Sequence, residues 1–217
     1  AVEFFDELVF GAREAAWPLI RDELKLSYSQ IGALLSIPGI VANGVEPIIA
    51  LAGDVWKRRN IIFVSGLVMA AATVLLAAGR SYVAVLIAFL IMYPASGGFV
   101  SLSQATLMDL APEKHEKNMA RWSVAGAIGS LAGPLILSVF LVTGLTWRNL
   151  FLCMALGMIV LVITQRTKDR GSAPSGYSNM REGVAGVLSA LRSGSILRRL
   201  ALLEVSDLML DVLFGFL

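Results

Sequence analysis

YVAVLIAFLIMYPASGGFVSLSQATL, residues Tyr82–Leu107, contains no charged residue over its whole length. A helix needs about 20 mostly apolar residues to cross the roughly 30 Å hydrocarbon core of a bilayer, so this stretch predicts a transmembrane helix. Comparable apolar runs, separated by short polar breaks, occur on both sides of it. These further predicted spans are Ala1–Ile20, Gln30–Gly53, Ile61–Gly79, Met119–Val142 and Trp147–Thr164, and a seventh begins near Leu200. The sequence therefore predicts an all-α, multi-pass membrane protein.

The composition supports this class of protein. Of the 217 residues, 57% are hydrophobic and 16% are charged, with a mean hydropathy of +0.75. Soluble domains average about 45–50% apolar and about 25% charged residues, so a water-soluble domain, a disordered chain and a coiled coil are excluded. The single Cys153 excludes an internal disulfide, and the single His115 excludes a His-rich metal cluster. We expect no metal and no cofactor.

The basic residues predict how the chain is oriented in the membrane. Lys and Arg are retained on the cytoplasmic side of short loops. With a cytoplasmic N-terminus, most of the 18 Lys and Arg residues fall on the cytoplasmic side, and the opposite loops hold only Arg21, Lys25, Arg80 and Arg148. We therefore expect an integral protein of a bacterial inner membrane with its N-terminus in the cytoplasm. The basic residues reflect this topology, so no nucleic-acid partner is expected.

The composition changes after the sixth span. A Gly/Ser/Pro stretch, Gly171–Ser175, is followed by a segment of helical periodicity, Ser178–Leu197. The sequence thus predicts a six-helix bundle over 1–165, a cytoplasmic linker with an amphipathic surface helix over 166–199, and the start of a seventh span over 200–217. Because the chain begins and ends inside apolar runs, we expect it to lack a C-terminal half.

Two stretches of the chain look like copies of each other. Glu3–Gly11 aligns without gaps on Asp207–Gly215, pairing Glu3 with Asp207 and Glu7 with Asp211. Chance similarity between two apolar helices is the alternative, although membrane carboxylates are rare. Both copies run in the same direction through the predicted membrane. This parallel repeat resembles the arrangement of the two halves of a major facilitator transporter.

The loop after the second span carries a further resemblance to the major facilitator superfamily. In Ala50–Arg59, the acidic Asp54 and the paired Arg58 and Arg59 match the loop signature of that family. Ala50, Val55 and Lys57 depart from it. The resemblance implies a gate in which an acidic and a basic residue hold one conformation at the cytoplasmic helix ends. A topological cluster of positive charge is the alternative explanation.

The fifth span resembles a glycine-rich signature of proton-driven drug exporters, and the N-terminal half as a whole resembles fosmidomycin-resistance-type exporters. The residues that carry this signature are Gly126, Gly129, Gly133 and Pro134. Generic packing of small residues between helices is the alternative. The fourth span lacks the intramembrane arginine that is common in such exporters.

Ionisable and aromatic residues of the first span recur at helical spacing and share one face. They are Glu3, Asp6, Glu7, Phe10, Arg13 and Glu14. A charged side chain at mid-bilayer costs roughly 2.5–3.5 kcal/mol, so this face must meet water or protein. Other spans supply polar residues at matching depths, and we expect all of them to converge on one substrate and ion pathway. These are Asn43, Glu46, Tyr93, Ser96, Gln104, Glu204, Asp207 and Asp211.

The predicted pathway is dominated by acidic groups, with Arg13 as its single base. Many ionised carboxylates in a narrow low-dielectric space repel one another, so protons or other cations are expected to share it. Asp6, Glu7 and Asp211 are the candidates for proton coupling. Static ion pairing is the alternative, and Arg13 is also a candidate anchor for an anionic group on a substrate.

These observations favour a secondary transporter that works by alternating access, in a lipid bilayer, on a small-molecule substrate. The resemblance implies proton-coupled export of a drug-like or amphiphilic compound. A lipid, lysolipid or organic-cation transporter without proton antiport is the alternative. A membrane-embedded enzyme is less favoured, because the sequence shows no nucleophile and base pair, no metal set and no phosphate loop.

Overall fold

The computed structural model describes residues 1–167, 182, 184–185, 192–195, 197–199 and 201–202. The chain divides into two compact units, 1–175 and 176–217, and the long helices all belong to the first unit. Apart from residues 201–202, the predicted seventh span lies outside the described residues, and so do its acids Glu204, Asp207 and Asp211. Most of the predicted surface helix, Ser178–Leu197, lies outside them as well.

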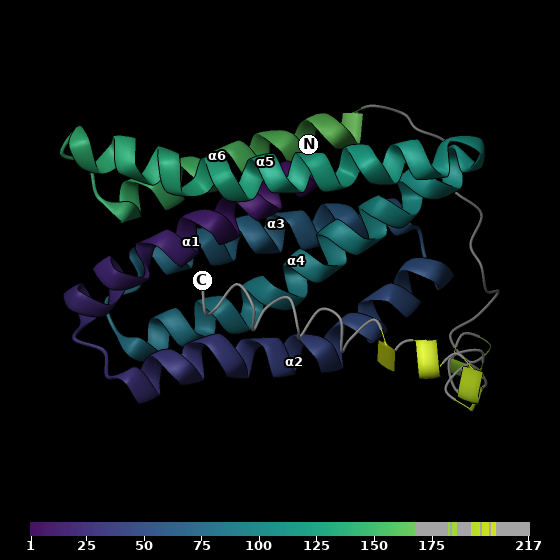
Figure 1. The fold of residues 1–217 in the computed structure, drawn as a ribbon, viewed down its shortest axis with the longest axis horizontal. Helices are drawn as coiled ribbons and strands as arrows, with labels where there is room; N and C mark the ends of the chain where they lie inside the picture. Colours follow the sequence, from purple (N-terminus) through teal and green to yellow (C-terminus); the bar gives the residue numbers. More distant parts are fainter. Residues whose placement is uncertain (168–181, 183, 186–191, 196, 200, 203–217) are drawn as a thin grey trace. The chain divides into compact units, whose positions relative to one another are not determined.

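Six long helices and one short 3-10 turn make up the described part of the first unit (Figure 1). They are α1 (Val2–Leu24), α2 (Tyr28–Val55), α3 (Arg58–Ala78), α4 (Tyr82–Leu110), η1 (Pro112–Lys114), α5 (His115–Val142) and α6 (Trp147–Thr167). Each of the six predicted spans falls on one helix, and most helices continue past the span into the polar loops. Hydropathy marks the stretch that meets hydrocarbon, whereas capping groups set the helix ends. At the start of α2, for example, the Ser27 and Gln30 side chains each accept a hydrogen bond from the other residue's backbone N–H.

Within the described residues, α2, α3, α4, α6 and the segment Pro112–Val142, which contains α5, are long and apolar enough to cross a membrane. Helix α1 does not reach that level of hydropathy because of its charged residues. Its position in the bundle explains the difference: α1 packs mainly against α5 and also touches α4 and α6. A helix surrounded by other helices can carry polar groups that lipid would not accept.

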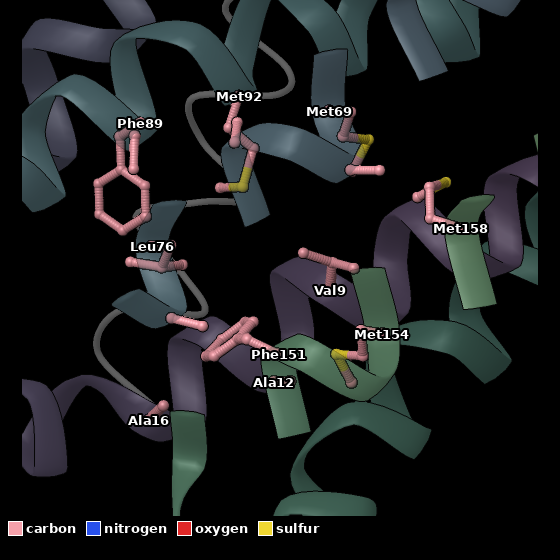
Figure 2. Packing of buried hydrophobic residues seen from close by; sticks show 14 of the residues in the cluster. Val9, Ala12, Ala16, Met69, Leu76, Phe89, Met92, Phe151, Met154 and Met158 are labelled. Atoms are coloured by element: carbon pink, nitrogen blue, oxygen red, sulfur yellow. The ribbon is translucent and has the colours of Figure 1, made fainter. Parts of the chain in front are cut away.

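The hydrophobic core lies where α1, α3, α4 and α6 meet. Figure 2 shows side chains from these four helices gathered together, among them Val9, Met69, Phe89 and Phe151. Phe89 and Phe151 are completely buried. Helices α2 and α5 contribute few residues to this core and flank it instead.

The outer surface of the bundle exposes many large hydrophobic residues. On α5, large hydrophobic residues recur at helical spacing and are exposed: Val124, Ile128, Leu131, Leu135 and Val139. A continuous apolar stripe of this kind is rare on a soluble protein and is typical of a helix that faces lipid. The described helices therefore form a membrane-embedded bundle.

Helices α1 and α5 approach each other through glycine. A Cβ placed on Gly129 or Gly133 would lie under 3.0 Å from backbone atoms of α1, and one placed on Gly11 would lie 2.5 Å from the carbonyl oxygen of Ser130. The two backbones thus touch directly, as small residues allow between membrane helices. This contact fixes the depth at which the polar face of α1 is presented.

Candidate functional site

The most deeply buried acid of α1 is Asp6, whose residue is 7% exposed. Its carboxylate accepts a hydrogen bond of 2.6 Å from the hydroxyl of Ser96 on α4. Ser96 is equally buried, so the pair forms a polar contact inside the bundle. A hydrogen bond to a charged group in a low-dielectric setting is strong, and its loss would leave a buried charge without a partner.

Two other acids of α1, Glu3 and Glu7, face α5 instead of α4. The Ser130 hydroxyl donates a 2.9 Å hydrogen bond to the carboxylate of Glu7. One turn earlier, Glu3 packs beside Gly126, where a Cβ would lie 2.9 Å from the Glu3 carboxyl group. Glu3 and Glu7 are both half-buried. The glycines of α5 thus provide the space in which these two carboxyl groups lie.

Arg13 is the centre of a second polar cluster between α1 and α4. It is 6% exposed, and its guanidinium donates hydrogen bonds to the Tyr93 hydroxyl and to the Glu14 carboxylate. Aromatic rings surround the guanidinium, with its carbon 4.6 Å from the Phe10 ring centroid and 5.7 Å from that of Phe89. Cation–π contact stabilises a desolvated guanidinium, so this cluster can hold a positive charge inside the bundle.

The predicted polar residues on α2 and α4 have different surroundings. Glu46 of α2 is half-buried, and its carboxyl group lies against Gly97 of α4, in the space that a Cβ would take. Gln104 donates to the sulfur of Met119 at 3.3 Å. Asn43 is exposed on α2. Glu46 therefore meets α4 at Gly97, the residue after Ser96, whereas Asn43 and Gln104 make no hydrogen bond with the α1 residues in the described structure.

The polar face of α1 is thus divided rather than uniform. Asp6 and Arg13 turn toward α4, Glu3 and Glu7 turn toward α5, and the side chain of Glu14 is 58% exposed. That all of them line one pathway stays a prediction, and these contacts show only which helix each residue meets. The physical reason for the division is that 3.6-residue periodicity places residues on one broad face, and two helices share that face of α1.

The residues of the predicted gate meet at the ends of α2, α3 and α4. Arg58 donates to Asp54 at 2.8 Å and to Asp109 at 2.6 Å. Its side chain is largely buried, whereas Arg59 is exposed. Arg58 therefore joins the end of α2 to the end of α4 through two ion pairs.

The sequence did not single out three residues that complete these clusters. Ser130 follows Gly129 on the small-residue face of α5, and that position was the available signal. Asp109 is an acid just after the fourth predicted span, on the same side of the predicted membrane as Arg58. Phe89 left no signal, because a lone aromatic residue in an apolar span is indistinguishable from core packing.

A bundle of membrane-length helices that keeps ionisable groups in its interior is the architecture of a multi-pass membrane transporter. The family model for the Major Facilitator Superfamily matches residues 4–217, and the chain belongs to this superfamily. No curated protein matches the chain. Members of this family are transporters rather than enzymes.

Proposed function

We propose that this protein is a secondary transporter of alternating-access type that couples export of a small drug-like or amphiphilic compound to proton movement. The observation that carries the proposal is the hydrogen bond of 2.6 Å between Ser96 and the buried carboxylate of Asp6. An ionised carboxylate at this depth carries a charge that is costly to bury, and uptake of a proton removes that cost. The strength of the α1–α4 contact therefore depends on whether Asp6 holds a proton.

The neighbouring acid supports the same idea from the other side of α1. Glu7 accepts its hydrogen bond from Ser130 of α5, whereas Asp6 accepts its bond from α4. A proton on Asp6 weakens its hydrogen bond with α4 and leaves the hydrogen bond between Glu7 and α5 unchanged. A proton on Glu7 has the opposite effect. A proton can shift the equilibrium between two conformations only if it binds one of them more strongly, and helix contacts that depend on protonation provide such a difference. We include Asp211 as the proposed counterpart of Glu7 in the internal repeat.

The Arg13 cluster supports a substrate that combines polar and aromatic or apolar groups. Phe10 and Tyr93 pack edge to face with ring centroids 5.4 Å apart, and both are partly exposed. Together with Arg13 they place aromatic surface beside a buried charge. Binding sites for small organic molecules have this mixed character.

We also propose that the N-terminus lies in the cytoplasm of a bacterial cell. The helix ends that share a level with Ala1 carry Lys57, Arg58, Arg59, Arg121 and Arg166, which all line one cavity with Ala1. Labelling with a membrane-impermeant thiol reagent tests this orientation. In a Cys153→Ser background, Arg80→Cys should be labelled in intact cells and Lys57→Cys only after the membrane is opened. The reverse pattern would overturn the orientation.

Transport in proteoliposomes tests the coupling. The complete protein is reconstituted with an imposed pH gradient and offered a panel of cationic, zwitterionic and anionic compounds. Gradient-driven flux of at least one compound should disappear in Asp6→Asn, while Asp22→Asn, a change at an exposed acid of the same helix, should transport normally. Flux that persists unchanged after the gradient is collapsed would point to a facilitator, including one for lysolipids or organic cations, and would contradict the proposal.

A further inference from the structure

A cavity of about 740 Å³ lies at the end of the bundle that holds the start of α1. All six helices contribute to its lining: the beginnings of α1, α3 and α5 and the ends of α2, α4 and α6. The volume is within the range of small-molecule sites, roughly 300–1,000 Å³. This cavity is separate from the Asp6 and Arg13 clusters, which do not line it.

The charges around the cavity are almost all positive. Lys57, Arg58, Arg121 and Arg166 line it together with Arg59, and among the described lining residues Glu3 is the only acid. Arg58 is neutralised by its two ion pairs, but Lys57 and Arg121 form no ion pair within the described residues. The positive charges of Lys57 and Arg121 therefore have no ion-pair partner in the part of the chain that the structure describes.

Two polar side chains deeper in the cavity wall lack partners among the described residues. Asn118 is 8% exposed, and its amide makes no hydrogen bond within that part of the chain. The hydroxyl oxygen of Ser103 is also buried without a hydrogen-bond partner there. A fully buried polar atom such as the Ser103 hydroxyl oxygen is almost always hydrogen-bonded, because leaving it unpaired is costly, whereas the Asn118 amide atoms are not fully buried. Both residues line the cavity, so a ligand inside it can supply the missing partners.

The aromatic and apolar residues in the cavity wall bear on which kind of anion would fit it. Trp56 and Trp122 line it, and tryptophan is enriched at the level of the lipid headgroups. Phe63 and Leu161 add apolar surface, and the guanidinium of Arg166 lies 4.1 Å from the centroid of the Phe63 ring. A site that combines positive charge, hydrogen-bonding groups and hydrocarbon surface matches a headgroup together with the start of its acyl chains.

We propose that this cavity binds the headgroup of an anionic phospholipid. Basic pockets between membrane helices are known sites for such headgroups. Topology alone explains why Lys and Arg gather at this end, but it requires neither a cavity nor the unpaired Asn118 and Ser103 in its wall.

Lipid exchange followed by native mass spectrometry tests the proposal. The complete, delipidated protein is titrated with phosphatidylglycerol, with phosphatidylcholine and with water-soluble glycerol 3-phosphate. Phosphatidylglycerol should bind and raise the melting temperature, and the other two should not. Equal binding of phosphatidylcholine would overturn the proposal, and so would an equal effect of glycerol 3-phosphate, which would indicate a site for a soluble anion.

Charge variants show whether the lipid occupies this cavity. Each Lys or Arg near an anionic lipid surface contributes about 1 kcal/mol, which corresponds to about five-fold in affinity. Arg121→Gln and Lys57→Gln should each weaken phosphatidylglycerol binding by about that factor. Arg80→Gln removes the same charge at the opposite end of the bundle and should leave binding unchanged. An equal loss in Arg80→Gln would show nonspecific attraction to the surface and would contradict the proposal.

Asn118→Leu separates lipid binding from a purely structural role. Without anionic lipid, this variant should be about as stable as the parent protein, because Asn118 makes no hydrogen bond within the described residues and leucine keeps a similar volume. With phosphatidylglycerol it should show a smaller rise in melting temperature than the parent. An unchanged lipid-dependent rise would mean that the amide does not face the bound lipid and would overturn this placement.

Discussion

Replacing Gly129 by alanine should destabilise the bundle, even though alanine is the better helix former. A Cβ at this position would lie under 3.0 Å from the carbonyl oxygen of Phe4, 3.0 Å from the Cβ of Glu7 and 3.1 Å from the backbone nitrogen of Leu8. These atoms belong to α1 and two of them are backbone, so they cannot move aside as the end of a flexible side chain can. The two helices must separate to make room for the methyl group.

The magnitude follows from two opposing contributions. Overpacking of a close contact typically costs about 1–3 kcal/mol, whereas Gly to Ala in a helix gains about 0.5–1 kcal/mol. Gly32→Ala in α2 is the matched control, because a Cβ there meets nothing within 4 Å. Gly32→Ala should therefore only gain the roughly 0.5–1 kcal/mol that alanine contributes over glycine in a helix. The free energies of unfolding of the two variants should therefore differ by about 2 kcal/mol, in opposite directions from the parent protein.

Thermal unfolding of the purified protein in detergent provides the assay. At about 2–4 °C per kcal/mol for a chain of this size, the two melting temperatures should differ by about 4–8 °C. Gly126→Ala should be milder than Gly129→Ala, because its Cβ would meet the flexible end of the Glu3 side chain at 2.9 Å. If Gly129→Ala melts at or above Gly32→Ala, direct backbone contact between α1 and α5 is refuted.

Two further predictions concern the ion pairs at the opposite ends of the bundle. Arg58→Gln and Asp109→Asn should each lower the melting temperature. In a double-mutant cycle, the double variant should lose less stability than the sum of the two single variants, with a coupling of about 0.5–1 kcal/mol. Strict additivity would show that the 2.6 Å pair contributes nothing. At the other end of the bundle, Arg148→Gln should lower the melting temperature more than Arg21→Gln. Arg148 joins α6 to Glu23 of α1 at 2.8 Å and also donates a hydrogen bond to the Ala77 carbonyl. Within the described residues, Arg21 pairs with side chains that are near it in sequence. Equal effects of the two changes would argue against this link between helices.

The number of long helices in the described chain and their approximate positions were available from the sequence. Apolar runs of about 20 residues form helices in a membrane because no other local structure satisfies every backbone hydrogen bond without water. The charges of the first span likewise showed that it could not face lipid. Both conclusions depend on the cost of exposing a group to hydrocarbon, which is a property of each segment by itself.

Only the tertiary structure decided which helices share the polar face of α1. Asp6 meets α4 and Glu7 meets α5 because glycines let α5 come into backbone contact with α1, and the shape of that contact is not encoded in hydropathy. The link from Arg58 to Asp109 likewise joins residues that are far apart in sequence. Hydropathy and periodicity determine whether each face of a helix can contact lipid or must contact protein or water. The fit between helix surfaces determines which helix packs against that face.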